Sequence, residues 1–237
     1  MTTEGKWPQL PPRLACIAQM VRPGAVVADI GTDHAHLPVA LVMEGICHHA
    51  YACDVAQGPL DRAKANILRH GQQEHITTIL ADGLAGVEDS DADTIVIAGM
   101  GGETIRDILQ PSALARKPEV TLLLQPMTAY PHLKAYLFEA GWQVQQERAV
   151  QEGEKCYTVL QVVRGQEPHP EEIYQYIGWH LWQQHDPVTE AYLHHQYQRY
   201  LRIWQGMARS SDGGQEDKRR AVRMVLDKLE QRWEEQT

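Results

Sequence analysis

The sequence predicts an α/β protein, with a mostly parallel sheet in the front part of the chain and a helical region behind it. Two observations predict this. From about residue 25 to residue 163, short and nearly continuous apolar runs alternate with longer amphipathic segments. Such runs are typical of parallel strands that helices cover on both faces. Beyond a polar, proline-bearing stretch at 165–170, glycines and β-branched residues thin out and helical periodicity takes over.

The predicted sheet contains five parallel strands followed by a hairpin. In chain order, the strands are expected at 25–30, 50–54, 76–80, 94–98 and 120–124. Helices are expected at 37–45, 59–70, 103–109 and 132–140, the first ending at Gly45 and the second being closed by Gly71. The segments 142–147 and 157–163 are typical of a closing β-hairpin, which adds an antiparallel edge. This order of elements favours a Rossmann-type sheet.

The rear part of the chain is expected to form a helical hairpin with coiled-coil-like packing. Apolar residues recur at helical spacing in two stripes on either side of a loop signal at 210–214. The stripes comprise Leu193, Tyr197, Tyr200, Leu201, Trp204 and Ala208, and then Val222, Leu226, Leu229 and Trp233. An earlier helix is expected at 171–184. We therefore predict two domains, 1–166 and 167–237.

The composition excludes several classes of protein. The 237 residues are 43% hydrophobic and 22% charged, which provides enough apolar side chains for a folded core. No apolar run is long enough to span a membrane and no secretion signal is apparent, so we expect a cytoplasmic protein. The four cysteines lack the spacing of a zinc site, so we expect reduced thiols and no metal. The net charge of −9 argues against a general nucleic-acid coat.

Acidic residues and glycines gather where the predicted strands end. The residues that we expect to bind a cofactor there are Asp29, Gly31, Asp54, Asp82, Gly83, Gly99 and Met100. In an open parallel sheet, ligands bind beyond the carboxyl ends of the strands. Taken singly, each acid has an alternative role as a helix N-cap. As a set, they favour a ligand site.

The spacing of glycines indicates which cofactor this site accepts. A dinucleotide site needs G-x-G-x-x-G to hold a pyrophosphate, but this chain offers only Gly31, with Asp33 in place of the second glycine. A carboxylate repels a pyrophosphate and attracts a cation, so we predict S-adenosylmethionine, which carries a sulfonium and an ammonium. Asp54 is expected to accept hydrogen bonds from its ribose hydroxyls and Asp82 from its adenine amino group.

Several segments together resemble a known family. They are 28–38 (ADIGTDHAHLP), 54–59, 82–84 (DGL), 97–102 (IAGMGG) and 123–126 (LLQP). With these motifs the chain resembles the bacterial TrmK family, the tRNA (adenine-22-N1)-methyltransferases, over essentially its whole length. The family usually has serine at the position of Thr32 and tyrosine at that of His36; the first difference keeps a hydroxyl, and the second exchanges a phenol for an imidazole.

The resemblance implies a class I methyltransferase sheet, S-adenosylmethionine as cofactor, and N1 of an adenine in the tRNA D-arm as the methyl acceptor. Neutral adenine N1 has a lone pair, so the enzyme needs no base to create the nucleophile. It must align the reacting atoms and stabilise the positive charge that moves to the ring. We expect Asp33 to supply that stabilising carboxylate, with a hydrogen bond from His34. Asp29 is the alternative carboxylate.

Further residues are expected to contact tRNA, and each has an ordinary structural alternative. Arg13 is either a phosphate contact or a surface arginine at a helix start; Tyr157 either stacks on a base or is a half-buried strand residue. Gln125, at the end of a strand, is a third candidate. The basic cluster of the rear hairpin comprises Lys218, Arg219, Arg220 and Arg223. On charge alone, a solvated helix face explains that cluster better.

The residues alone are compatible with two other functions. The acidic surface is compatible with methylation of a small molecule or a protein, and a cofactor-binding RNA protein without turnover is a third hypothesis. The basic cluster argues against the former and the series of strand-end acids against the latter. We expect the protein to act on tRNA as a monomer, with no membrane and no metal.

Overall fold

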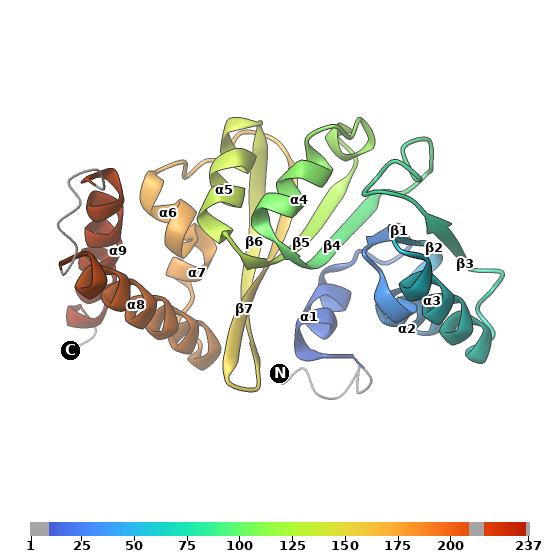
Figure 1. Ribbon diagram of the computed structural model, residues 1–237, viewed down its shortest axis with the longest axis horizontal. Coiled ribbons are helices and arrows are strands. Elements are labelled where there is room, and N and C mark those ends of the chain that lie inside the picture. The colour runs from blue at the N-terminus through green and yellow to red at the C-terminus, as the bar shows by residue number, and fades with distance from the viewer. Residues whose placement is uncertain (1–9, 209–215, 236–237) are drawn as a thin grey trace.

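The computed structural model describes residues 10–208 and 216–235 (Figure 1). In this part of the chain, seven strands form one sheet in the order β3-β2-β1-β4-β5-β7-β6. All neighbouring pairs are parallel except β5–β7 and β7–β6. The strands are β1 (Ala25–Ile30), β2 (Cys47–Asp54), β3 (Ile76–Leu80), β4 (Thr94–Gly101), β5 (Thr121–Thr128), β6 (Trp142–Glu152) and β7 (Lys155–Arg164). The prediction of a Rossmann-like sheet with an antiparallel hairpin is confirmed.

Helices cover both faces of the sheet, which explains the nearly continuous apolar strands. One core packs the inner faces of α1, α2 and α3 against the sheet, and the other packs α4 and α5 against the opposite face. Every residue of β1 is buried, as expected for the central strand of such a sandwich. The bounds of these helices are α1 (Pro12–Met20), α2 (His36–Met43), α3 (Gln57–Arg69), α4 (Gly102–Leu109) and α5 (Tyr130–Glu139). Helix α1 appeared in the sequence analysis only as the alternative of a helix start at Arg13.

Three parallel strands and the hairpin are longer than the sequence suggested, and β2 begins at Cys47 in place of residue 50. β4 continues to Gly101 and β5 to Thr128, because the two strands stay paired beyond an irregularity near Gly99. Gly99 has a φ of 77°, a left-handed conformation that glycine adopts without strain. The hairpin strands also continue to the two-residue turn between Glu152 and Lys155. As a result, the ends of β4, β5 and β6 and the beginning of β7 reach beyond the other strands at the carboxyl edge of the sheet.

The rear part of the chain is helical, as predicted, but its first helix is broken. In place of one helix at 171–184, the structure has α6 (Glu172–Ile177) and α7 (Trp179–Gln183) on either side of Gly178. Gly178 has a φ of 75°, which ends α6. A Cβ at this position would overlap the Glu147 carboxylate of β6 and crowd the Tyr130 hydroxyl of α5. The break between α6 and α7 therefore depends on packing against the sheet, and the local helical periodicity of the sequence gives no sign of this packing.

The hairpin consists of α8 (Pro187–Ala208) and α9 (Glu216–Glu234), which pack on each other. Their apolar faces form a third core with α6 and α7, and Ala149 and Cys156 of the β-hairpin pack against it. The helices therefore lie against the β6 end of the sheet, opposite α3 at the β3 end (Figure 1). The expected loop at 210–214 and the side chain of Ala208 lie outside the described residues. Coiled-coil character and the domain boundary at 166 stay predictions.

The structure offers neither a membrane span nor a metal site in the ranges that it describes. No helix there combines the length and the apolar composition that crossing a bilayer requires. In the same ranges, no group of three or more His, Cys, Asp or Glu side chains is arranged to hold a metal ion.

Candidate active site

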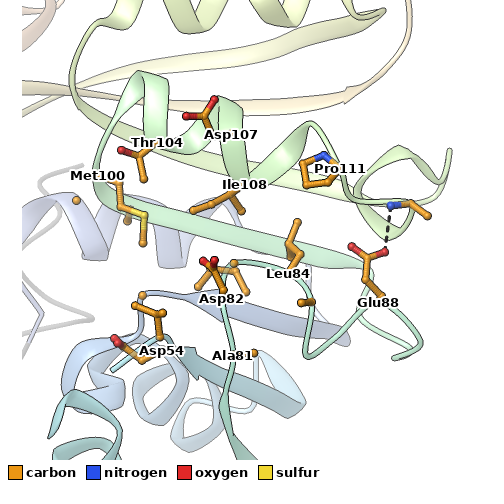
Figure 2. A pocket seen from close by; sticks show the side chains of 18 residues that line it. Asp54, Ala81, Asp82, Leu84, Glu88, Met100, Thr104, Asp107, Ile108 and Pro111 are labelled. Carbon is orange, nitrogen blue, oxygen red and sulfur yellow. Dashed lines mark hydrogen bonds between the residues drawn. The ribbon is translucent and has the colours of Figure 1, made fainter. Parts of the chain in front are cut away.

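A cavity of about 830 Å³ opens at the carboxyl edge of the sheet (Figure 2). The ends of β1, β2 and β4 and the loop after β3 form one side, and α4 with the loop behind it forms the other. Six of the predicted cofactor-binding residues line it: Gly31, Asp54, Asp82, Gly83, Gly99 and Met100. The chain reverses its direction across the sheet between β1 and β4, and this switch point is where open α/β sheets bind ligands.

The lining of this cavity is acidic. Its side chains include the four carboxylates Asp54, Asp82, Glu88 and Asp107, and no lysine, arginine or histidine is among the described lining residues. Figure 2 shows Asp54 and Asp82 on the strand side and Asp107 on the α4 side. Carboxylates on two sides attract a cation and repel a phosphate. The cavity is therefore suited to a positively charged ligand that lacks phosphate groups.

A hydrogen bond to the backbone and a glycine in the left-handed conformation shape two of the strand ends that form the floor of the cavity. The Asp54 side chain is 9% exposed, and its Oδ1 accepts a hydrogen bond of 2.9 Å from the backbone N–H of Ala56. Gly31 has a φ of 75°, and a Cβ there would overlap the methyl group of Met100. Because the methionine side chain is flexible and its methyl can move aside, the positive φ rather than this contact sets the requirement for glycine.

Asp29, the seventh predicted cofactor-binding residue, lies outside the cavity lining and is buried. Its Oδ2 accepts a hydrogen bond of 2.7 Å from the hydroxyl of Thr32. Burial raises the pKa of Asp29 to about 6, and the charge of Asp54 acts in the same direction. The Thr32 hydroxyl thus holds the Asp29 carboxylate in position. A serine at position 32 would also carry a hydroxyl.

The predicted catalytic pair, Asp33 and His34, lies in the turn between β1 and α2 and does not line the cavity. Asp33 is exposed, and its Oδ1 is 3.0 Å from Nη2 of Arg62 on α3 and 3.6 Å from Nε2 of His34. His34 and Ala35 both have positive φ values, 60° and 51°. Non-glycine residues adopt this conformation at a cost, and it is concentrated at functional sites.

Two predicted substrate contacts have partners within the protein. Gln125 has no exposed surface, and its Oε1 accepts a hydrogen bond of 3.1 Å from the backbone N–H of Gly99. It therefore braces the end of β4, and contact of this buried side chain with a substrate stays a prediction. Nη1 of Arg13 lies 2.7 Å from Oε1 of Glu152, so this arginine joins α1 to the tip of the β-hairpin. The sequence alone did not place a carboxylate opposite it.

The other predicted substrate residues lie on the helical side of the molecule. Tyr157 is half-buried at the start of β7 and lines a groove against α8. The cluster Lys218, Arg219, Arg220 and Arg223 lies on the exposed side of α9. Arg220 forms an ion pair of 3.3 Å with Glu172, and Arg223 one of 2.6 Å with Asp227. The structure does not bring this cluster to the cavity.

The α4 wall of the cavity was not predicted from the sequence. Thr104, Asp107 and Ile108 line it from this helix, and Leu84 lines it from the loop after β3. A signal was available, because positions 104, 107 and 108 share one face of the helix that begins directly after β4. Figure 2 shows Ile108 and Leu84 beside Asp82, which gives the cavity an apolar section next to its acidic one.

Comparisons with known proteins agree with this geometry. Residues 10–160 match the model of a methyltransferase-domain family. A Bacillus subtilis protein named tRNA (adenine(22)-N(1))-methyltransferase is 36% identical over 152 residues, which is 64% of this chain and 64% of the relative's length. The sequence match thus covers slightly less than two thirds of that relative.

Solved structures extend the likeness to nearly the whole chain. The crystal structure of the B. subtilis M1A22 tRNA methyltransferase TrmK has a TM-score of 0.82 at 28% identity, covering 95% of this chain and 98% of that one. A Streptococcus pneumoniae protein in complex with S-adenosyl-L-methionine has a TM-score of 0.78 at 33% identity, covering 90% and 98%. The chain therefore belongs to the methyltransferase-domain family and, within it, to the TrmK family.

Proposed function

We propose that the protein is an S-adenosylmethionine-dependent methyltransferase that methylates N1 of adenine 22 in the D-arm of tRNA. The observation that carries the proposal is the cavity at the switch point, lined by four carboxylates and, within the described chain, by no basic side chain. That lining discriminates a cationic methyl donor from the nicotinamide dinucleotides, whose pyrophosphate it repels. The names of the two relatives described above support the choice of donor and acceptor.

The residues present fit this cofactor. Asp54 keeps one carboxylate oxygen free of the Ala56 hydrogen bond, and it would accept from the ribose hydroxyls. Asp82 would accept from the adenine amino group, and Leu84 and Ile108 supply apolar surface for the ring. Asp29 lies two residues before Gly31 of the lining and interacts electrostatically with Asp54, and its charge would favour the ammonium end. When bound, the cofactor supplies a methyl group on a positively charged sulfur.

The protein's own contribution to the reaction is positioning and charge stabilisation. The acceptor nitrogen already carries a lone pair, so no residue has to remove a proton before transfer. Asp33, two residues beyond Gly31, is the carboxylate that we assign to the positive charge that develops on the adenine ring. The Arg62 guanidinium holds its Oδ1, and His34 lies next to it. Arg62 therefore positions Asp33.

The rear hairpin is the part of the chain that we assign to tRNA binding, with residues 1–166 carrying the methyl transfer. The exposed cations of α9 are suited to phosphate contacts; they are Lys218, Arg219, Arg220 and Arg223.

We propose that the protein works as a monomer in the cytoplasm. Among the described residues, none of the exposed large apolar side chains lies on α8 or α9; they are Met43, Val55, Leu68, Leu80 and Met127. Cys16, Cys47 and Cys53 are buried free thiols.

The proposal is tested with unmodified tRNA transcripts and labelled S-adenosylmethionine, followed by nucleoside analysis. We expect label in 1-methyladenosine from a transcript with adenine at position 22, and none from the matched transcript with guanine there. Label in another nucleoside would assign a different acceptor. A protein that binds the cofactor but labels no RNA would contradict the proposed substrate.

A further inference from the structure

A second hollow lies next to the acidic cavity and differs from it in charge. This groove of about 320 Å³ lies between the end of β5, the beginning of β7 and one face of α8. Lys155, Arg199 and Arg202 contribute cationic side chains to its lining, against the single carboxylate Glu154. We call this hollow the α8 groove. The α8 groove is positively charged, which suits a polyanion, whereas the cavity is negatively charged, which suits a cationic methyl donor.

The cations of the α8 groove are available to a ligand. Lys155, Arg199 and Arg202 are all exposed. In the ranges that the structure describes, none of the three forms an ion pair, whereas Arg220 and Arg223 of α9 each have a carboxylate partner. The guanidinium of Arg199 lies 5.6 Å from the ring centre of Tyr200, a contact that holds the side chain without neutralising its charge.

Aromatic side chains lie among these cations. Tyr157 of β7 and Tyr176 of α6 are half-buried and line the groove, and His195 lies on the same helix as Arg199. Grooves that combine cations with ring surfaces are typical of sites for single-stranded nucleic acid, because phosphates meet the cations and unstacked bases meet the rings. An acidic peptide would use the cations and leave the rings without a flat partner.

The groove and the cavity meet at the ends of β4 and β5. Met100 lines the cavity, and its strand partner Pro126 lines the groove. The next pair in the register, Gly101 and Thr128, continues the same edge, and Thr128 also lines the groove. Adjacent strands are about 4.8 Å apart, so one ligand can reach both hollows. A base presented to the methyl donor at the Met100 end of the cavity would have its neighbouring nucleotides over this edge.

We propose that the α8 groove binds the RNA segment that flanks the acceptor base, with Arg199 and Arg202 contacting phosphates and Tyr157 contacting a base. The proposal rests on the proposed function, because a reactive adenine N1 lies on the Watson–Crick edge and has to be unpaired. Its neighbours are then partly unstacked, which is the form of RNA that aromatic and cationic grooves recognise. The groove thereby selects RNA in which the target base is already displaced.

The test compares two double variants of equal charge. R199Q/R202Q removes two cations from the groove, and K64Q/R69Q removes two exposed cations from α3, at the opposite end of the sheet (Figure 1). We would measure the Kd for an unmodified tRNA transcript at several salt concentrations, and the Kd for S-adenosylmethionine. For the groove variant, we expect roughly tenfold weaker tRNA binding and a salt slope lower by about 1 to 2. The α3 variant should bind tRNA like the wild type, and both should bind the cofactor normally.

Tyr157 provides a second, charge-independent measurement. Y157F keeps the ring and should retain tRNA affinity, whereas Y157A should weaken it by roughly tenfold, the scale of one lost base–aromatic contact. Thermal unfolding of both variants separates a folding defect from a binding defect.

The outcomes distinguish this inference from the proposed function. A wild type that forms 1-methyladenosine, together with groove variants that keep its tRNA affinity and salt slope, would overturn the groove and leave the function intact. Equal losses in the groove and α3 variants would also overturn it, since they would indicate a general charge effect. A wild type that binds tRNA through the groove but forms no 1-methyladenosine would support the groove and contradict the function.

Discussion

At the scale of single residues, the carboxylates at the sheet edge have different environments and therefore different roles. Asp54 lines the cavity and is held by a backbone N–H, Asp29 is buried outside the cavity lining, and Asp33 is exposed and paired with Arg62. Asp29 and Asp54 lie in the last two residues of a strand and Asp33 lies in the turn behind one, so the sequence places all three acids at the same edge of the sheet. Burial and hydrogen-bond partners separate them.

Substitution of Asp33 and Asp54 should separate turnover from cofactor binding. D54A should weaken S-adenosylmethionine binding by about tenfold or more, because hydrogen bonds to a charged group are worth roughly 1.5–3 kcal/mol. D33A should keep cofactor affinity within about twofold and lower kcat by roughly a hundredfold or more, the scale of one lost electrostatic contact. Calorimetric titration and methyl-transfer kinetics measure the two effects. D61A, an exposed acid on α3, serves as the control. The reverse pattern would exchange the two assignments.

The buried carboxyl of Asp29 should make stability depend on pH. Its pKa is raised from 3.8 to about 6, so the native state holds the proton more tightly than the unfolded chain does. The resulting stabilisation is complete below pH 3.8 and is lost as the pH rises through about 6. Relative to D29N, the wild type should lose roughly 2–3 kcal/mol of unfolding free energy between about pH 4 and pH 7. Urea unfolding of both proteins at several pH values measures this difference, and parallel curves would refute the burial argument.

At the scale of elements, the junction of α6 and α7 shows how packing overrides helical periodicity. Gly178 lies over a buried group in which Nζ of Lys134 is 2.8 Å from Oε1 of Glu147, and the Tyr130 hydroxyl donates to the same oxygen. Burial, with the Glu147 charge beside it, raises the pKa of Tyr130, so the phenol stays protonated and remains a donor. The close approach of the Gly178 backbone to this group leaves no room for a side chain and joins the helical region to α5 and β6.

Two glycine substitutions should have opposite effects on stability. G178A introduces a Cβ into the Glu147–Tyr130 contact at a positive φ, and we expect a loss of roughly 2–4 kcal/mol. Gly206, in the last part of α8, faces open space: no neighbouring side chain would lie within 4 Å of an added Cβ, so G206A should gain about 0.5–1 kcal/mol. Denaturant unfolding of both variants measures the difference. Similar values for the two would mean that the α6–α7 junction tolerates a side chain.

At the scale of the whole molecule, opposite charges are separated along one edge of the sheet. The cavity at the ends of β1, β2 and β4 is acidic, and the groove between β5, β7 and α8 carries the cations. The net charge of −9 is a sum over the whole chain and does not show that acidic and basic side chains lie in different hollows. A cationic donor and a polyanionic acceptor can therefore be bound next to each other, each by surface of the opposite charge.

Ligand stabilisation tests the charge of the cavity in the intact protein. S-adenosylmethionine at about one hundred times its Kd should raise the unfolding free energy by about 2.7 kcal/mol. NAD at the same concentration should leave the unfolding temperature unchanged, because its pyrophosphate would meet the carboxylates Asp54 and Asp82. Differential scanning calorimetry measures both. Equal stabilisation by NAD would refute the argument that this cavity discriminates against phosphate.

The sheet, the position of the ligand site and the residues along its floor could all be predicted from the amino-acid sequence. They follow from local pattern: apolar runs define the strands, and polar residues directly behind them reach the same edge because the strands are parallel. Features that depend on distant segments meeting became visible only in the folded molecule. There Arg62 lies beside Asp33, Gln125 lies beneath Gly99, the α4 wall faces Asp54, and the helix breaks at Gly178. Local periodicity does not encode them, because elements far away in the chain set the burial and the partners of each side chain.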